Sequence, residues 1–558
     1  MSDEYIKNIV IVGGGSAGWM TAAYLSKALD KNVHITLIES SNITTIGVGE
    51  ATFSTIKLFF DFLGLQEYEW MPKCHATYKM GIKFVDWNAK RQHFYHPFQR
   101  YEVIDGFDIS EWWLKIKKNQ EPFDYACFLI PWLCDNQKSP RYLDGQVFDE
   151  KVQNEFSSQH IAKKNILNNL KIQYPYAYHF DANLLAKFMK DFAMCRGVKQ
   201  IVDDVIDVKL TEDGNIDHIN TKEHGSINGD IFIDCTGFRG LLINKVLGEP
   251  FISYAESLLC DSAIAMQLPT DMQKNGIKPY TTATALNNGW VWNTPLYSRS
   301  GSGYVYSSAF ISPEEAEKEF REHLGEACDN CKASHIKMKV GRNRNSWVKN
   351  CVAIGLSSGF VEPLESSGIF FIQHAIEELV NHFPNKSSNE EIINSYNKVI
   401  ADCIDGVRDF LILHYYASDR VDTEFWKATK HNIKVPEELR EKFKLWKNRL
   451  PNNKNINPKF HGFESYSYSV MLLGLNYMPE SSLPVLEHVE DQNAKATFMA
   501  IQERANYLSA TLPSHYEYLT HVIKSQEQSE YLDANNLVSS YSNENNLAGS
   551  KESLQIVV

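Results

Sequence analysis

A glycine-rich turn near the start of the chain, Gly13-Gly-Gly-Ser-Ala-Gly18, limits the fold more than any other feature of the sequence. The residues before it, 8–12, form a short apolar run of the kind found in buried strands. The residues after it are rich in alanine to about Leu29, as in a helix, and residues 33–38 form a second apolar run. The sequence therefore predicts a βαβ unit at the start of the chain.

The spacing of these glycines fits the G-x-G-x-x-G turn that binds a dinucleotide. Gly13 allows the tight turn, Gly15 lets backbone amides approach a pyrophosphate, and Gly18 lets the helix and strand pack closely. Glu39 follows the second apolar run, where an acid can accept a hydrogen bond from a ribose hydroxyl and disfavours NADP. The alternative is an ordinary glycine-rich turn, and the fingerprint alone does not decide between FAD and NAD.

Later segments indicate how the sheet is completed. Residues 229–237 and 350–355 each have the pattern of a buried strand that ends at a small-residue turn. Residues 280–311 alternate as antiparallel strands do, and beyond about Pro384 the pattern is helical. We predict an α/β fold in one interwoven single-domain body: a Rossmann-like βαβ module, an added antiparallel sheet and a mostly helical C-terminal part.

The expected boundaries follow from these patterns. Residues 1–385 form the dinucleotide-binding module, with a substrate-side sheet inserted at about 245–335. Residues 386–523 form a mainly helical part that covers the substrate pocket. Residues 524–558 are rich in Ser, Asn, Glu and Gln with few apolar anchors, so we expect a mobile polar tail.

Composition narrows the class of partner and the compartment. Lys and Arg total 56 against 69 Asp and Glu, giving a net charge of -13 without a dense basic run, which disfavours nucleic acid and anionic membranes. Cys328 and Cys331 form a lone C-x-x-C, so we expect no metal site and reduced thiols, as in the cytoplasm. Residues 9–25 are apolar but contain four glycines and follow Asp3 and Glu4, which excludes a signal peptide.

The segment Phe360-Val-Glu-Pro-Leu-Glu-Ser-Ser-Gly368 leads into an amphipathic helical pattern that begins at Ile369. Free backbone amides at such a helix start, at Ser367 and Gly368, can bind a small anion such as chloride. Glu365 would face the same cavity. Ordinary capping, with Glu365 as a partner of the helix dipole, is the interpretation that this segment alone favours.

Lys79 lies in a stretch, 77–87, that alternates like a single strand, and a lysine in such a position is usually solvated. Trp290 and Trp292 lie on one side of a predicted strand, where two large rings can wall off a pocket or simply pack in the core. Neither observation identifies a site by itself.

Taken together, the motifs resemble those of the flavin-dependent tryptophan halogenases, most closely the subgroup of 5- and 6-halogenases. The resemblance extends from about Lys7 to Leu519. It departs from the family at Thr294, where Ile is usual before the proline, and at Ser367, where Thr is usual. The segments that carry it are Gly13-Gly-Gly-Ser-Ala-Gly-Trp-Met20, Gly47-Val-Gly-Glu-Ala-Thr-Phe53, the Lys79 strand, Tyr95-His-Pro-Phe98, Glu111-Trp-Trp113, Trp290-Val-Trp-Asn-Thr-Pro295 and Phe360 to Gly368.

The resemblance implies a reaction in two compartments. FAD, supplied as FADH₂ by a separate flavin reductase, would react with O₂ and with chloride or bromide held near Ser367 and Gly368, giving hypohalous acid. This oxidant would travel along a tunnel screened by Trp290 and Trp292 to Lys79. Glu365 would polarise the oxidant or accept the ring proton of L-tryptophan. The resemblance is compatible with a homodimer.

Further contacts are implied position by position. The positions that resemble the family's flavin contacts are Gly13, Gly15, Ser16, Ala17, Gly18, Glu39, Gly49, Ala51, Val205, Leu356 and Ile369. The positions that resemble its indole contacts are Phe53, His96, Pro97, Phe98 and Trp290. The positions that resemble its contacts to the amino-acid end of tryptophan are Gln173, Phe463 and Tyr466.

The segment Phe463-Glu-Ser-Tyr466 is similar to the same segment of tryptophan 5-halogenases, so we expect 5-halotryptophan as the main product. The 6-isomer is the alternative, because residues 76–79 and 470–474 resemble 6-halogenases as much as 5-halogenases. Three other functions remain open. A flavin aromatic hydroxylase usually has an Asp in the turn that here reads Gly355-Leu-Ser, and a catalytically silent flavoprotein would not need Lys79 and Glu365. A halogenase of another indole is the third.

Overall fold

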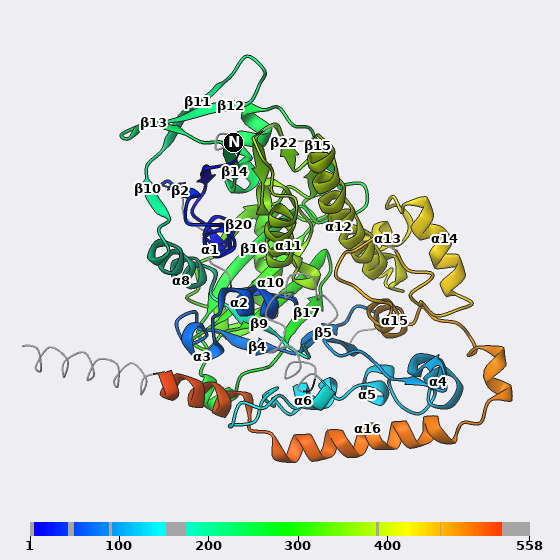
Figure 1. Cartoon of the computed structure of the whole chain (residues 1–558). Helices are drawn as coiled ribbons and strands as arrows, with labels where there is room; N and C mark the ends of the chain where they lie inside the picture. Colours follow the sequence, from blue (N-terminus) through cyan, green and yellow to red (C-terminus); the bar gives the residue numbers. More distant parts are fainter. Residues whose placement is uncertain are drawn as a thin grey trace, which may run out of the picture.

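The computed structural model of the chain describes residues 5–42, 49–88, 92–151, 154, 174–386, 390–457 and 459–526. Figure 1 shows a parallel sheet in the upper half of the molecule, a larger mixed sheet below it, and helices along the side and bottom. The predicted α/β fold, with a parallel Rossmann-like sheet and a helical C-terminal part, is confirmed.

The parallel sheet is centred on β1 (Asn8–Val12), whose apolar residues are buried on both faces. β1 pairs in parallel with β2 (His34–Glu39) and with β14 (Ile231–Asp234), which is the strand predicted from residues 229–237. The sheet order is β10-β2-β1-β14-β23-β22, with β10 (Lys199–Val202), β23 (Cys351–Ala353) and an antiparallel edge strand β22 (Trp347–Val348). On it, α1 (Ser16–Ala28) contacts α8 (Ala182–Cys195) and α11 (Ser367–Asn381).

The mixed sheet joins two distant parts of the chain. Its order is β20-β16-β19-β18-β17-β5-β6, and only β17 and β5 pair in parallel. Early strands therefore extend a sheet whose other strands come from the middle of the chain, so the two cannot fold as separate units. The strands are β5 (Gly81–Val85), β6 (His93–Pro97), β16 (Ser262–Leu268), β17 (Thr281–Ala285), β18 (Gly289–Pro295), β19 (Ser300–Tyr306) and β20 (Ser334–Lys337).

The stretch that contains Lys79 is not the single strand that its alternation predicts. β4 (Thr77–Lys79) belongs to a small sheet with β3 (Glu50–Ala51) and β9 (Ala177–Phe180), and the chain passes to the mixed sheet at Met80. Because β4 pairs with β9 in the interior, Lys79 is buried, and its interpretation as a solvated residue is wrong.

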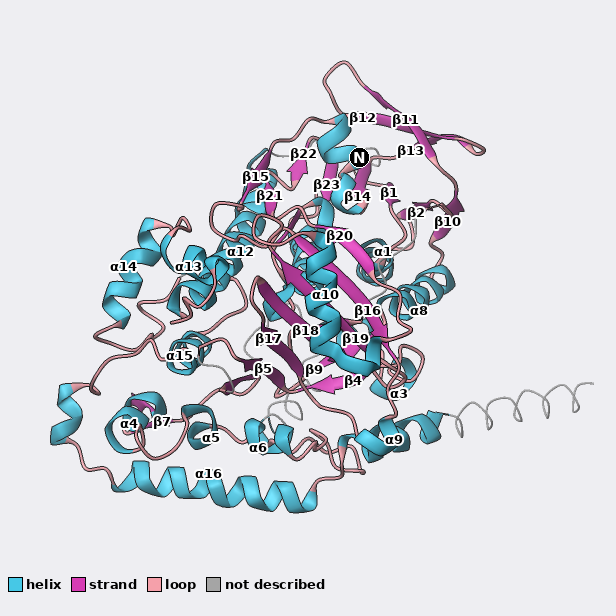
Figure 2. Ribbon diagram, turned by 180° about the vertical axis from the view of Figure 1, so that it is seen from behind, coloured by secondary structure: helices cyan, strands magenta, loops and turns pink. Residues whose placement is uncertain are grey.

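The C-terminal part, from residue 390 onward, is mainly helical, as expected. α12 (Glu390–Ala417) packs on α11, and α15 (Ser465–Gly474) packs on both α12 and β6. α16 (Gln492–Thr511) runs outside α5 (Phe123–Cys127) and α6 (Ile130–Asp135), as Figure 2 shows from behind. Residues 515–526 are helical as well, and 527–558 of the predicted tail lie outside the described residues.

The remaining elements are shorter or peripheral. No helix in the described ranges is both long enough and apolar enough to cross a membrane. The other helices are α2 (Ile56–Leu63), α3 (Glu67–Trp70), α4 (Ile109–Ile116), α9 (Met272–Asn275), α10 (Pro313–Leu324), α13 (Glu424–His431) and α14 (Glu437–Trp446), and the other strands are β7 (Val103–Ile104), β8 (Phe107–Asp108), β11 (Val205–Leu210), β12 (Ile216–Thr221), β13 (Gly225–Asn228), β15 (Phe251–Ser253), β21 (Gly341–Asn343) and β24 (Gly359–Phe360).

The glycine turn allows a test of the packing. A Cβ on Gly18 would stand 1.8 Å from the carbonyl oxygen of Gly13, so α1 would have to move away from the turn. We expect Gly18→Ala to lower the free energy of unfolding by about 1–3 kcal/mol in denaturant titrations. Gly15→Ala is the control, because its Cβ would meet no atom within 4 Å. Equal losses in the two variants would contradict this account.

Candidate active site

Lys79 lies at the end of β4 with its ammonium group in the interior. Its Nζ donates to the carbonyl oxygen of Thr52 at 3.2 Å and to Oγ of Ser366 at 2.8 Å. It also lies 5.0 Å from the centre of the Phe98 ring. Burial lowers the pKa of Lys79 to about 7, although the negative charge of Glu365 acts in the opposite direction. At neutral pH the lysine can therefore both donate and accept a proton.

Glu365 ends the short turn η6 (Pro363–Glu365), and its carboxylate is buried between two histidines. Nδ1 of His96, from β6, lies 3.0 Å from Oε2, and Nε2 of His414, from α12, lies 2.7 Å from Oε1. Burial raises the pKa of Glu365, but the charge and hydrogen bonds of the two histidines lower it to about 2. The carboxylate is therefore ionised and oriented at neutral pH.

The start of α11 has the features of an anion site. Ser366 occupies the N-cap position with a φ of 63°, but its hydroxyl accepts from Lys79 and does not cap the helix. Oγ of Ser367 is buried without a hydrogen-bond partner in the part of the chain that the structure describes. A Cβ on Gly368 would meet no atom within 4 Å. Unused donors and open space at a helix N-terminus fit a halide ion.

The glycine turn likewise has room for a dinucleotide. No atom lies within 4 Å of a Cβ built on Gly15, and no side chain caps the start of α1 at Ser16. Glu39, at the end of β2, accepts from Nε1 of Trp19 at 3.2 Å and from the amide of Gln200. The open turn, the uncapped helix and the acid at the end of β2 fit the pyrophosphate and ribose of FAD.

The other predicted flavin contacts lie on several separate segments of the chain. Gly355, which precedes Leu356, approaches so closely that a Cβ on it would be 2.9 Å from Cβ of Ala17. The backbone N–H of Asp203, two residues before Val205, donates to the carbonyl of Glu39 at 2.9 Å. Gly49 immediately precedes β3, and Ala51 is the last residue of that strand. Leu356 is 36% exposed in the turn η5 (Gly355–Ser357), and Ile369 is buried in the first turn of α11.

Most of the predicted substrate contacts belong to a cluster of packed aromatic side chains beside Glu365, which is named the chamber. The ring of Phe463 stacks on Phe410 with centroids 3.8 Å apart and meets the edge of Phe53 at 5.2 Å. Phe463 and Tyr466 lie 6.3 and 6.4 Å from the His96 ring, and Pro97 and Phe98 follow His96. Trp290 is fully buried in β18, and Gln173 lies outside the described residues.

Several residues that hold this chamber together were not predicted. Ser366 and Thr52 bind Lys79, His414 binds Glu365, and Glu362 binds the indole N–H of Trp290. Thr52, Glu362 and Ser366 stand inside motifs that the sequence analysis singled out, and His414 does not. His414 sits in the last turn of a 28-residue helix, where no local pattern marks it.

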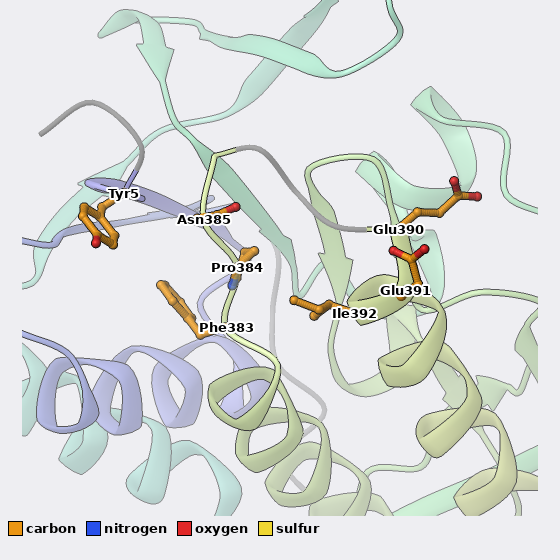
Figure 3. Close-up of a pocket in the computed structure, with 7 residues that line it drawn as sticks. All are labelled: Tyr5, Phe383, Pro384, Asn385, Glu390, Glu391 and Ile392. Atoms are coloured by element: carbon orange, nitrogen blue, oxygen red, sulfur yellow. The ribbon is translucent and has the colours of Figure 1, made fainter. Parts of the chain in front are cut away.

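The hollow found elsewhere on the surface does not contribute to the site. A surface hollow of about 590 Å³ lies between Tyr5, Phe383 and the acidic start of α12, and Figure 3 shows Glu390 and Glu391 on its rim. None of the predicted site residues lines it. The described residues contain no group of His, Cys, Asp and Glu side chains that could hold a metal ion.

Known proteins resemble the chain over almost its whole length. The family model described as tryptophan halogenase matches residues 8–491. Tryptophan 6-halogenase SttH from Streptomyces toxytricini is 50% identical over 517 residues, which cover 91% of this chain and 97% of that protein. 7-chloro-L-tryptophan 6-halogenase KtzR from Kutzneria sp. (strain 744) is 50% identical over 512 residues, covering 92% of this chain and 98% of that protein.

The likeness extends to the fold. The solved structure of a tryptophan C-6 flavin-dependent halogenase (chlorinase) from taromycin biosynthesis matches with a TM-score of 0.87 and 47% sequence identity. The match covers 92% of this chain and 99% of that one. Fold and sequence therefore agree over the part of the chain that carries the chamber.

The buried lysine gives a pH-dependent prediction. Since the pKa of Lys79 falls from 10.5 to about 7 on folding, the unfolded chain binds more protons between these values, and stability conferred at this position rises with pH. The free energy of unfolding of the wild type, minus that of Lys79→Met, should therefore increase from pH 7 to pH 10 in denaturant titrations. A difference that does not change with pH would contradict the burial of this charge.

Proposed function

Because the chain belongs to the flavin-dependent tryptophan halogenase family, we propose that it chlorinates or brominates free L-tryptophan at C6 of the indole. The observation that carries the proposal is the pairing of Lys79 and Glu365 inside one aromatic chamber beside the uncapped start of α11. Two charged groups in the interior cost free energy because each must be desolvated, and buried groups with shifted pKa values are characteristic of active sites.

FAD fits the turn at Gly15 and the start of α1, with Glu39 at the ribose, as described above. When bound as FADH₂, it supplies the electrons with which O₂, a halide ion and a proton give hypohalous acid and water. The backbone amides of Ser367 and Gly368 would hold the halide. A separate flavin reductase would deliver the reduced cofactor, since the sequence contains no second nucleotide-binding fingerprint.

The chain's own residues account for the substitution step. In its ammonium form Lys79 gives a proton to the oxygen of the hypohalous acid, so that this oxygen leaves as water when the O–halogen bond breaks and the halogen bonds to the ring carbon. The C–H bond breaks next, and the ring proton passes to the ionised carboxylate of Glu365. His96 and His414 keep that carboxylate ionised and in place.

The position of halogenation is supported by the relatives and not by the local segment. The two relatives at 50% identity and the structure at 47% carry the name of 6-halogenases, which favours the alternative of the sequence-based prediction over C5. The segment Phe463 to Tyr466 remains similar to 5-halogenases. Its Glu464 forms a two-pronged ion pair with Arg100, which ties the segment to the end of β6 outside the chamber.

Two variants test the assignment of Lys79 and Glu365. Lys79→Ala should abolish formation of halotryptophan, while oxidation of FADH₂ by O₂ and the unfolding temperature stay near those of the wild type. Glu365→Gln keeps the shape but removes the base, so it should slow the reaction by about 10²-fold or more. Product is measured by mass spectrometry with reductase, FAD and NaBr. Substantial turnover by Lys79→Ala would refute its role.

The product itself tests the position. NMR of the isolated product should show 6-halotryptophan. Changing Phe463, Glu464 and Ser465 to Leu, Pro and Pro should leave position 6 dominant and reduce any 5-isomer, because a shift of about 1 Å in substrate register can change the rate about 100-fold. A wild-type product halogenated mainly at C5 would overturn the choice of position, but not the choice of reaction.

A further inference from the structure

A second carboxyl group lies one turn before Glu365 and has no role in the reaction described above. Glu362 immediately precedes η6 and is fully buried, with 0% of its surface exposed. Its Oε2 accepts from Nε1 of Trp290 at 3.1 Å and from the hydroxyl of Tyr415. Both donors come from other elements, β18 and α12, so Glu362 joins three parts of the fold.

The two carboxyl groups are held by consecutive residues of one helix. His414 binds Glu365 and Tyr415 binds Glu362, so α12 forms hydrogen bonds with both ends of the turn. The turn is short, contains Pro363 and ends in the left-handed residue Ser366, whose hydroxyl binds Lys79. A shift at Glu362 would therefore reach both charged groups of the chamber.

The surroundings of Glu362 differ from those of Glu365. Its hydrogen-bond partners, Tyr415, Trp290 and Cys260, are uncharged groups, and burial raises its pKa to about 7 although their hydrogen bonds act in the opposite direction. The thiol of Cys260 lies beside it, 3.7 Å from the Tyr415 hydroxyl. What the two donors need is an acceptor oxygen, which a neutral side chain can also provide.

We propose that Glu362 is a positioning residue for halogenation: it fixes the Trp290 ring and the turn that carries Glu365 against α12. The proposal rests on the proposed function, because it assigns Glu362 to the chamber in which that reaction occurs. Burial of this carboxyl group costs free energy, and its contacts with Trp290 and Tyr415 hold in place the ring and the turn that the proposed reaction uses.

The test compares Glu362→Gln with Glu362→Leu. Gln keeps an acceptor oxygen of the same reach, and Leu removes it at similar volume. We expect Leu to lower halotryptophan formed per FADH₂ oxidised at least tenfold, and Gln to stay within threefold of the wild type. The acid limb of the pH–rate profile should move to higher pH in Leu only, because Glu365 then loses its fixed contact with His414.

The matched control is Glu377→Leu. Glu377 is a carboxyl on α11 whose pKa burial also raises to about 7, and it binds Gln373 outside the chamber. Its loss should leave the yield per FADH₂ and the pH profile unchanged. A folded Glu362→Leu with wild-type yield and pH profile would overturn the proposal, as would a Gln variant as impaired as Leu.

Two further measurements keep the test decisive. If Glu362→Leu does not fold, Tyr415→Phe removes one donor with little change in volume and must lower the yield, and an unchanged yield overturns the proposal. The indole N–H resonance of Trp290 in ¹⁵N-labelled protein should shift in Tyr415→Phe and stay in place in Glu377→Leu. A wild type that does not halogenate tryptophan refutes the proposed function, while this resonance still tests the role of Glu362.

Discussion

The contact on which the chamber depends is the hydrogen-bonded carboxylate of Glu365 between His96 and His414. Glu365 belongs to the turn before α11, His96 to the mixed sheet and His414 to the C-terminal helices, so one buried charge joins three parts of the chain. Leaving such a charge unpaired would cost several kcal/mol. The three parts are therefore held in register by the group that we propose as the base.

The same arrangement prepares the neighbouring charge. Ser366 follows Glu365 with a positive φ and turns its hydroxyl toward Lys79, which leaves the first amides of α11 uncapped. One short segment of chain thus contains an ionised carboxylate and a helix start without a cap, and it contacts a lysine whose pKa is about 7. Aromatic rings around them exclude water, which strengthens each electrostatic interaction.

The sequence was most informative where the chemistry is local. The turn from Gly13 to Gly18 needs its glycines because a Cβ on Gly13 or Gly18 would collide with backbone. Its place between a strand and a helix follows from short-range periodicity. Lys79 was misjudged by the same reasoning, because alternation cannot reveal that the chain changes sheets at Met80 or that β9 covers β4.

The sequence by itself determined the dinucleotide turn, the α/β class and, through its motifs, the family. Only the tertiary structure decided which groups hold Lys79 and Glu365. His96 and Glu365 are separated by 269 positions and His414 by a further 49, so no local pattern links them. The ionised state of Glu365 and the lowered pKa of Lys79 arise from burial and neighbouring charge, which exist only once distant segments have packed together.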